Sequence, residues 1–457
     1  MQADIDEVVH VRLEGPLAEL LAKVDPTLYT EYLVTERGKS VMYVQLQKAL
    51  YGTVTAALLF WKDLTGHLSA EGFKANPYDS CVMNKMVDGK QCTVLWHVDD
   101  LKISHADSGV TEGVLDRLNI RYGKETPLTV TRGDIHEYLG MTIDFSTDGK
   151  VVIRMDDYVE DMLGEVPEDM RTGPAATPAS EYLFKVNADA EALSGSESDI
   201  FHSVTAKLLF LCKRARPDIQ TPIAFLCTRV RNPDVDDYKK LRRVVCYLRN
   251  TKKLALTLEA DDLQVIKWWI DASFAVHKDM RSHTGGTMSF GKGSVYSTSV
   301  RQKLTTKSST EAELVGVDDV MPMVLWTRQF LEGQGYKIKD NIVYQDNQSA
   351  MLLEKNGQRS STKRTRHLNI RYFFVTDRIQ AKELTVEYCP TGDMWADVFT
   401  KPLQGAAFVK FRKLILNLSD GGPEVTAPID HRSVLSKNVS WADVVRTGPK
   451  NSKTGPR

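Results

Sequence analysis

The sequence predicts a protein of mixed α/β class with more than one domain. Its 457 residues exceed the length of one ordinary domain and can bury more than one core. Short β-like runs bounded by turn residues alternate with helical patterns along the chain. A hydrophobic fraction of 42% and a charged fraction of 26% are typical of a globular protein. We therefore expect two or three domains.

The amino-acid composition indicates where the protein is located more clearly than which reaction it performs. The net charge of −1 neither demands nor excludes a polyanionic partner, because binding depends on where cations cluster. The six cysteines form no Cys-x-x-Cys pair, which favours reduced thiols and argues against structural zinc. No apolar run reaches the length of a membrane span, and the N-terminus lacks a signal-peptide pattern. We expect a soluble, intracellular protein, cytoplasmic or nuclear, without a membrane partner.

The first 150 residues contain a predicted hairpin. The β-like runs 93–98 and 101–104 flank Asp99 and Asp100, which places two acids at the tip. Adjacent carboxylates repel each other unless a cation compensates them, so the pair suggests a metal site. A solvated Asp-Asp turn is the structural alternative, and the local pattern alone favours it.

Residues 151–262 combine loop signals with helices. Gly and Pro residues between 165 and 180 predict linkers, and apolar spacing predicts helices over 203–211 and 238–248. The second helix carries Lys239, Arg242 and Arg243. Such a cluster is usually a solvated face, and contact with a phosphate backbone is the alternative.

The last third predicts three strands, a helix, a strand, two helices, a strand and a helix. The strands are expected over 266–271, 285–290, 294–297, 342–346 and 384–388. The first helix begins near Glu313, and Pro322 is expected to kink or interrupt it.

Four carboxylates lie in order across this region: Asp271, Glu313, Asp346 and Asp397. Clustered carboxylates suit hard cations such as Mg²⁺, and two such ions offset the charge of a phosphodiester while activating water. Each acid also has a structural alternative. Thr310-x-x-Glu313 is a helix capping box, Asp346 an N-cap, and Asp397 a charge at a helix N-terminus. The joint order of the four is what favours a site.

Four strings carry a family resemblance. They are Gln302-Lys-Leu-Thr-Thr-Lys-Ser-Ser-Thr-Glu-Ala-Glu-Leu314, Tyr344-Gln-Asp-Asn-Gln-Ser-Ala350, Arg366-His-Leu-Asn-Ile-Arg-Tyr372 and Ala396-Asp-Val-Phe-Thr-Lys401. Residues 263–405 resemble the ribonuclease H domain of copia-type LTR retrotransposon polyproteins. The predicted succession fits that fold, a mixed five-stranded sheet with helices.

The resemblance implies two Mg²⁺ ions, with Mn²⁺ as a substitute, that hydrolyse the RNA strand of an RNA/DNA hybrid. It implies that Asp271 bridges both ions, that Glu313 and Asp346 complete one site, and that Asp397 completes the other. The densest basic run, Arg359, Lys363, Arg364, Arg366, His367 and Arg371, would contact the hybrid's phosphates. A charged surface loop entering a helix is the structural alternative for this run.

Val98-Asp99-Asp100, with Gln47–Gly52 and Tyr138–Met141, resembles the palm of a copia-type reverse transcriptase. That resemblance implies a template-primer partner and makes Asp99 and Asp100 catalytic metal ligands. His97 stands where the family usually has Tyr. The family's first palm carboxylate would precede Met1, so we expect a truncated palm and no DNA synthesis by this chain alone. An active RNA-directed DNA polymerase from an incomplete gene model and a decayed, non-catalytic remnant are the alternatives.

These interpretations predict a partial palm over 1–150, a connection or thumb-like region over 151–262 and a ribonuclease H domain over 263–405. Residues 406–457 are expected to be a helix end and a disordered tail, rich in polar and small residues. Other polyprotein segments are further candidate partners.

Overall fold

The computed structural model describes residues 8–46, 54–124, 126–357 and 369–419. Helices make up 43% and strands 24% of the structure, which confirms the predicted mixed class. The chain divides into two compact units, one of residues 1–139 and 322–339 and the other of residues 140–321 and 340–457. The predicted four-part division into domains stays a prediction.

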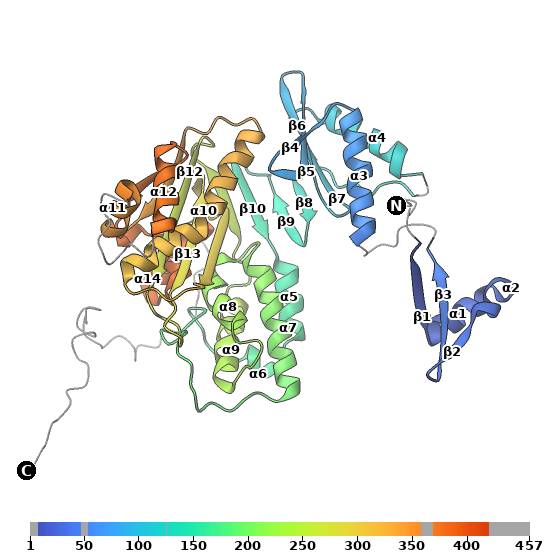
Figure 1. Ribbon diagram of the computed structural model, residues 1–457, viewed down its shortest axis with the longest axis horizontal. Helices are drawn as coiled ribbons and strands as arrows, with labels where there is room; N and C mark the ends of the chain where they lie inside the picture. Colours follow the sequence, from blue (N-terminus) through green and yellow to red (C-terminus); the bar gives the residue numbers. More distant parts are fainter. Residues whose placement is uncertain (1–7, 47–53, 125, 358–368, 420–457) are drawn as a thin grey trace, which may run out of the picture. The chain divides into compact units, whose positions relative to one another are not determined.

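The first unit contains two antiparallel sheets, in the strand orders β1-β3-β2 and β4-β5-β6-β7 (Figure 1). A core of apolar side chains such as Leu64, Met83, Trp96 and Leu118 joins α3 and α4 to the second sheet. The elements are β1 (His10–Glu14), α1 (Pro16–Val24), α2 (Pro26–Tyr29), β2 (Val34–Glu36), β3 (Lys39–Gln45), α3 (Val54–Ala70), β4 (Lys74–Asn76), β5 (Asp79–Val87), β6 (Lys90–His97), β7 (Asp100–Ser104), α4 (Ser108–Tyr122) and β8 (Ile135–Tyr138).

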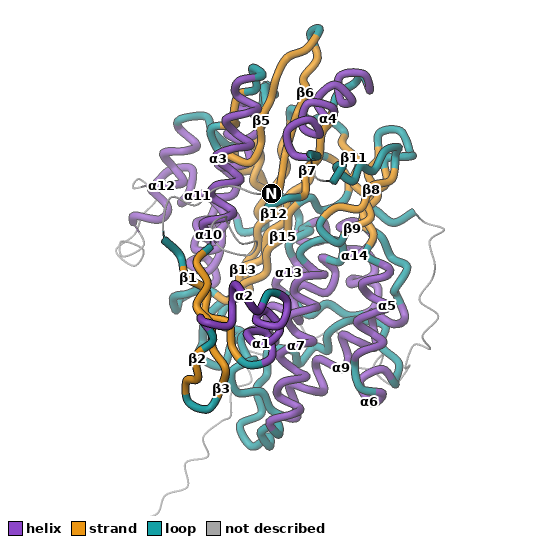
Figure 2. The backbone as a smooth tube through the Cα atoms, turned by 90° about the vertical axis from the view of Figure 1, so that its right-hand side faces the viewer, coloured by secondary structure: helices purple, strands orange, loops and turns teal. Residues whose placement is uncertain are grey.

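The second unit begins with strands β9 and β10, and a helical region follows. Its helices lie side by side and share a core with buried residues such as Phe201, Leu241 and Tyr247 (Figures 1 and 2). Four strands of this unit pair antiparallel in the order β14-β11-β10-β9. The elements are β9 (Met141–Asp144), β10 (Lys150–Arg154), α5 (Asp156–Glu165), α6 (Glu168–Arg171), α7 (Gly195–Cys212), α8 (Gln220–Cys227), α9 (Val235–Asn250), β11 (Leu256–Ala260) and β14 (Gly291–Lys292).

The predicted five-stranded mixed sheet is confirmed in the second unit. Its order is β15-β13-β12-β16-β17; the first three strands pair antiparallel, and β12, β16 and β17 run parallel. The predicted succession of strands and helices is also confirmed. The elements are β12 (Val265–Ser273), β13 (His283–Ser289), β15 (Tyr296–Arg301), α10 (Ser309–Gly333), β16 (Asp340–Gln345), α11 (Gln348–Asn356), α12 (Asn369–Gln380), β17 (Thr385–Tyr388), α13 (Asp397–Thr400) and α14 (Gly405–Leu416).

Two adjacent glycines in β13 let helices approach both faces of this sheet. Successive residues of a strand point to opposite faces. A Cβ atom at Gly285 would lie 2.6 Å from the Thr400 side chain of α13, and one at Gly286 would lie 3.2 Å from the Val320 side chain of α10. Gly285 pairs with Asp271 on β12, so the first glycine brings α13 close to that carboxylate.

Helix α10 begins with capping contacts that do not use Glu313. The Ser308 hydroxyl accepts from the backbone N–H of Glu311 at 3.2 Å, and the Glu311 carboxylate accepts from the N–H of Lys307 at 2.7 Å. The Thr310-x-x-Glu313 capping box is therefore not the cap of this helix. Pro322 lies inside α10, which continues through it to Gly333, so the expected interruption does not occur.

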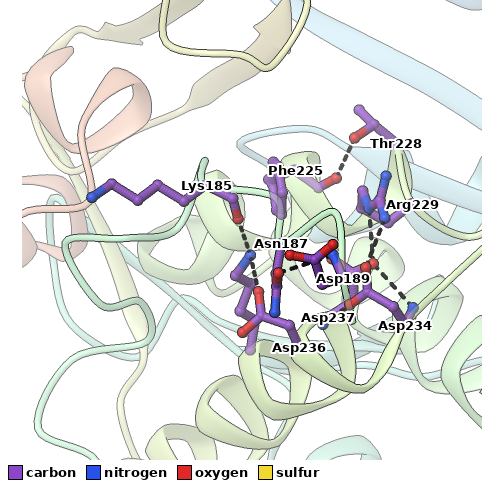
Figure 3. A network of polar contacts seen from close by, with 10 residues as sticks. Lys185, Asn187, Asp189, Phe225, Thr228, Arg229, Asp234, Asp236 and Asp237 are labelled. Atoms are coloured by element: carbon purple, nitrogen blue, oxygen red, sulfur yellow. Dashed lines mark hydrogen bonds and ion pairs between the residues drawn. The ribbon is translucent and has the colours of Figure 1, made fainter. Parts of the chain in front are cut away.

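Helix α9 is held by a network of carboxylates at its start (Figure 3). Asp234 and Asp237 form a capping box, each accepting from the other's backbone N–H. Arg229 donates to both carboxylates, at 2.8 Å to Asp237 and 3.0 Å to Asp234. Asp236 pairs with Lys240 one turn later at 2.8 Å, as acidic and basic residues four apart on a helix do.

A buried pair of histidines joins β13 to a loop of the second unit. His277 Nε2 lies 2.9 Å from His283 Nδ1, and His283 Nε2 lies 2.7 Å from the Ser299 hydroxyl. The Phe184 ring packs on both imidazoles. Burial lowers the pKa of His277 to about 4 and that of His283 to about 3. Both rings are therefore neutral at pH 7.

The free energy of unfolding is expected to fall as the pH drops below 6.5. Below that pH the histidines become protonated in the unfolded chain but stay neutral in the folded protein. The free energy of unfolding that these residues contribute above pH 6.5 is therefore lost progressively toward pH 3. Because of His283 alone, the free energy of unfolding should fall by about 2 kcal/mol between pH 6.5 and pH 5, since one proton contributes at most about 1.4 kcal/mol per pH unit. Urea unfolding at the two pH values measures this loss. His283→Asn should reduce the loss, whereas His202→Gln, at an exposed position of α7, should not. Equal losses in all three proteins would contradict the assignment.

Among the described residues, no helix combines the length and apolar character that crossing a bilayer requires. All six cysteines are free thiols, in agreement with the absence of a Cys-x-x-Cys pair.

Candidate metal centre

Three of the four predicted carboxylates meet in the second unit. One oxygen each of Asp271, Glu313 and Asp346 lies within 4.8 Å of the others. Asp271 belongs to β12, Glu313 to the first turns of α10, and Asp346 follows the last residue of β16. Asp271 and Glu313 are buried, and Asp346 is half-buried. Three elements far apart in sequence thus direct their acids to one point.

Asp346 is not the N-cap of a helix, which was the structural alternative for this residue. The N-cap of α11 is Asn347, whose side chain accepts from the N–H groups of Ser349 and Ala350 at 3.1 Å each. The Asp346 carboxylate instead accepts a hydrogen bond from the Thr391 hydroxyl at 2.9 Å. Asp346 is thus oriented toward the segment that leads to Asp397.

Asp397 lies beside Asp271 and outside the group of three. It is the first residue of α13, and Lys401 follows one turn later. The Lys401 ammonium lies 2.6 Å from an Asp397 oxygen and 3.3 Å from an Asp271 oxygen. The Thr400 hydroxyl donates to that same Asp271 oxygen. Sequence reasoning missed Thr400 and Lys401, although the string Ala396–Lys401 contains both.

A stack of two tryptophans explains why Asp271 and Asp397 are neighbours. The Trp269 and Trp395 rings are parallel, at 4.3 Å between centroids and 4° between planes. Each tryptophan precedes one of the two acids by two residues. Trp269 shares the face of Asp271 because side chains alternate along a strand. The stack therefore fixes the start of α13 against β12, with the two carboxylates on the same side.

The concentration of buried negative charge alters the protonation of this centre. Burial, followed by repulsion from Asp271 and Asp346, raises the pKa of Glu313 well above its ordinary value. Burial and repulsion from Asp271 raise the pKa of Asp397 to about 7, against the opposing effect of Lys401. Burial would lower the pKa of Lys401, but Asp271 and Asp397 outweigh it and raise that pKa. Clustered, buried carboxylates of this kind are stabilised by a bound cation.

The donor set fits a hard divalent cation. Three carboxylates supply oxygen ligands, which Mg²⁺ and Mn²⁺ prefer, and the group contains neither thiolate nor imidazole. Asp271, Glu313 and Asp346 would hold one ion. Asp271 and Asp397 are both contacted by the Lys401 ammonium.

Asp99 and Asp100 lie where the hairpin prediction places them. Strands β6 and β7 pair antiparallel, with His97 opposite Asp100, so Val98 and Asp99 form the two-residue turn. Val98 has a φ of 57°, which is strained for a β-branched residue. Both acids are exposed. Within the described part of the chain, they belong to no group of three ligands able to hold a metal ion.

The six residues of the basic run at 359–371 have no described side chains. Arg359, Lys363, Arg364, Arg366 and His367 lie outside the described residues, and Arg371 is part of α12 without a described side chain.

The predicted basic residues of α9 differ in their contacts, although Lys239 and Arg243 line the same cavity. Lys239 is exposed and lines a cavity of about 550 Å³ together with Tyr182 and Lys185. Arg242 donates to the carbonyl of Thr172 at 2.6 Å, and Arg243 donates to the carbonyl of Thr177 at 3.0 Å. These two guanidinium groups hold the 172–177 loop, and phosphate contact by all three residues stays a prediction.

Comparison with known proteins identifies relatives among transposon polyproteins. The Pol polyprotein of transposon TNT 1-94 from Nicotiana tabacum is 25% identical over 386 residues, which is 83% of this chain and 28% of the relative. The Pol polyprotein of transposon RE1 from Arabidopsis thaliana is 26% identical over 375 residues, 81% of this chain and 25% of the relative. The chain thus spans about a quarter of the length of these relatives.

The other comparisons add little. No family model matches the chain. The crystal structure of prototype foamy virus protease-reverse transcriptase aligns with 80% of this chain, over 41% of the viral chain, with 14% identity and a TM-score of 0.22. The homologues of this chain are therefore Pol polyproteins of copia-type retrotransposons, matched over about four-fifths of its length, and the chain resembles a fragment of such a polyprotein.

Proposed function

We propose that this chain is part of the reverse transcriptase and ribonuclease H region of a retrotransposon polyprotein, and that residues 263–405 hydrolyse the RNA strand of RNA/DNA hybrids. Homology to Pol polyproteins supports the region as a whole. Residues 1–150 would be a partial polymerase palm, and residues 151–262 a connection.

The observation that carries the proposal is the convergence of Asp271, Glu313 and Asp346 within 4.8 Å. Burying like charges together costs free energy, and neither Glu313 nor Asp346 forms an ion pair with a described residue. A fold keeps such an arrangement when a cation offsets it. Structural acids, by contrast, would be paired or exposed.

Different residues would bind the metal ions and orient the metal ligands. Asp271, Glu313 and Asp346 would bind one cation and Asp397 would contribute to a second position, where bound divalent ions offset phosphodiester charge and activate water. Thr391 and Thr400 hold the Asp346 and Asp271 carboxylates in fixed orientations. Selection of RNA would come from 2′-hydroxyl contacts and hybrid shape.

Incubation of the full chain with an end-labelled RNA/DNA hybrid tests the proposal. We expect Mg²⁺-dependent cleavage of the RNA strand that EDTA abolishes, and no cleavage of DNA duplex. Asp346→Asn should reduce the rate on the order of a hundredfold or more, because a carboxylate is removed from the electrostatic centre.

Asp393→Asn provides the matched control. Asp393 is an exposed acid in the segment before Asp397 and pairs with Lys410 at 3.1 Å. This variant should cleave like the unmodified chain. Cleavage by Asp346→Asn at the rate of the control would reject the proposed site. Absence of cleavage by every protein, with retained hybrid binding, would favour a decayed, non-catalytic remnant.

An RNA-directed DNA polymerase is the second candidate function. The β6–β7 turn, with its strained Val98, presents Asp99 and Asp100 at an exposed tip. Phosphoryl transfer needs metal ions held by more ligands than these two carboxylates. DNA synthesis would therefore require a further carboxylate from a segment other than those described.

A further inference from the structure

The cavity beside α9 has walls that are mainly basic. Its volume is about 550 Å³, and it is lined by the loop 178–187 and by one face of α9. The charged residues of the lining are Lys185, Asp236, Lys239, Lys240 and Arg243. Lys240 pairs with Asp236, so these two charges offset each other. The lining therefore keeps the positive charges of Lys185, Lys239 and Arg243.

The two remaining lysines of the cavity are available to an anion. Lys185 and Lys239 are both exposed, and neither forms an ion pair with a residue that the structure describes. The Lys185 ammonium lies 4.4 Å from the centre of the Tyr182 ring, and Figure 3 shows the lysine side chain extending away from the carboxylates of Asp189 and Asp236. Tyr182 lines the cavity and is 54% exposed. Free ammonium groups beside an exposed aromatic ring suit a phosphate that is joined to a nucleoside.

The loop that forms one wall of the cavity is held by hydrogen bonds to its backbone. Carbonyl groups of residues 177–185 accept from the side chains of Arg243, Gln404 and Lys240. Gln404 lies three residues after Lys401, so this wall is joined to the segment that leaves the metal centre. A wall that is already positioned reduces the entropy lost when a ligand binds.

The size of the cavity favours a single strand over a duplex. A volume of about 550 Å³ lies in the range of pockets that enclose one small ligand. A double helix keeps its bases stacked inside and presents its backbone, whereas a single strand can turn one nucleotide into such a cavity. The occupant that fits both the charge and the volume is therefore one unpaired nucleotide with its phosphates.

We propose that the cavity between the loop 178–187 and α9 binds an unpaired nucleotide of a nucleic-acid strand. Lys185 and Lys239 contact its phosphates, Tyr182 packs against its base, and Arg243 holds the wall while adding its charge to the cavity. The strand is a single-stranded extension of the hybrid that is cleaved at the metal centre. In this last point the inference rests on the proposed function.

Binding of a short fluorescent DNA strand to the full chain in EDTA tests the inference without cleavage. Lys185→Gln/Lys239→Gln should weaken binding roughly tenfold and reduce the slope of log affinity against log salt by about 1.4, since each phosphate contact on a single strand contributes about 0.7. Lys185→Arg/Lys239→Arg keeps both charges and should keep the affinity. Lys253→Gln is the matched control, because Lys253 is exposed just beyond α9 and does not line the cavity. It should bind like the unmodified chain.

Tyr182→Ala and pyrophosphate separate a nucleotide site from a site for small anions. Loss of the ring should weaken strand binding about fivefold or more, the effect of removing one stacked base. Pyrophosphate lacks a nucleoside and should displace the strand only at a much higher concentration than an unlabelled strand requires. Displacement at similar concentrations, with unchanged strand binding by Tyr182→Ala, would show a small-anion site and overturn the assignment.

Competition by hybrids tests the source of the nucleotide. An unlabelled hybrid with a single-stranded extension should displace the labelled strand better than a blunt hybrid of the same paired sequence. Equal displacement by the two hybrids, or equal strand affinity of Lys185→Gln/Lys239→Gln and Lys253→Gln, would overturn the inference whatever the cleavage results. Strand binding that is lost in the double lysine variant, with no cleavage by any protein in Mg²⁺, would reject the proposed function and leave the strand site standing.

Discussion

Replacing Glu313 with glutamine should abolish most of the cleavage and stabilise the fold at the same time. The Glu313 side chain is buried beside Asp271 and Asp346, and burial and their repulsion raise its pKa. Glutamine has nearly the same shape, carries no charge and donates N–H groups that both acids can accept. We expect a loss of rate on the order of a hundredfold or more and a gain in free energy of unfolding of about 1–2 kcal/mol. Hybrid cleavage and urea unfolding in EDTA measure the two effects.

Glu311→Gln is the matched control for this prediction. Glu311 lies two residues earlier in α10 and is also buried, but its carboxylate caps the helix by accepting from Lys307 N–H. Its replacement should leave cleavage largely intact and should not stabilise the protein. A Glu313→Gln variant that is less stable than the unmodified chain would show that the acid has a structural role, and the metal-ligand assignment would then lose its physical basis.

The different results expected for Glu311→Gln and Glu313→Gln illustrate what sequence patterns leave open. The string Ser308-Ser-Thr-Glu-Ala-Glu313 contains two overlapping capping patterns, and the spacing of Thr310 and Glu313 fits a capping box. The choice is made by where the helix begins, since Ser308 supplies the capping hydroxyl. Once Ser308 and Glu311 form the cap, Glu313 lies one turn inside the helix, free to point toward β12.

The pattern of apolar residues predicted the strands of the five-stranded sheet better than it predicted the geometry of the metal centre. Apolar runs located the strand that carries Asp271 and the strand that precedes Asp346. The distance between acids on different strands and helices depends on register and on close approaches such as that at Gly285, which a single segment does not encode. Family resemblance supplied the set of four acids, and Lys401 was missed because a lysine at a helix end usually faces solvent.

Arg216 and Asp218, which lie between α7 and α8, form a buried ion pair. Arg216 donates to both Asp218 oxygens, at 2.9 and 2.8 Å, and both residues are at most 2% exposed. The Arg216 guanidinium also donates to the carbonyl and the hydroxyl of Thr251, at 3.0 and 2.9 Å. The Tyr247 hydroxyl donates to Asp218 at 2.6 Å. This network ties the turn between α7 and α8 to the end of α9.

Asp218→Ala should cost about 3–5 kcal/mol of unfolding free energy, because it leaves the Arg216 charge buried without its counter-ion. The Tyr247 hydroxyl loses its acceptor as well, which adds an unsatisfied buried donor. Equilibrium unfolding in urea at pH 7 measures the loss. Hybrid cleavage, assayed at a temperature where the variant remains folded, should change little, since neither residue belongs to the metal centre.

The double variant Arg216→Met/Asp218→Leu distinguishes a buried-charge penalty from a general loss of packing. Removing both charges eliminates the unpaired guanidinium, and apolar side chains of similar volume replace the pair, so the double variant should be more stable than Asp218→Ala alone. A double variant at least as unstable as Asp218→Ala would mean that the bonds from Arg216 to Thr251, rather than the ion pair, hold α9 in place. In that case Thr251→Val, which removes the hydroxyl acceptor of Arg216 and keeps the carbonyl acceptor, should reproduce part of the loss while leaving the Arg216–Asp218 pair intact.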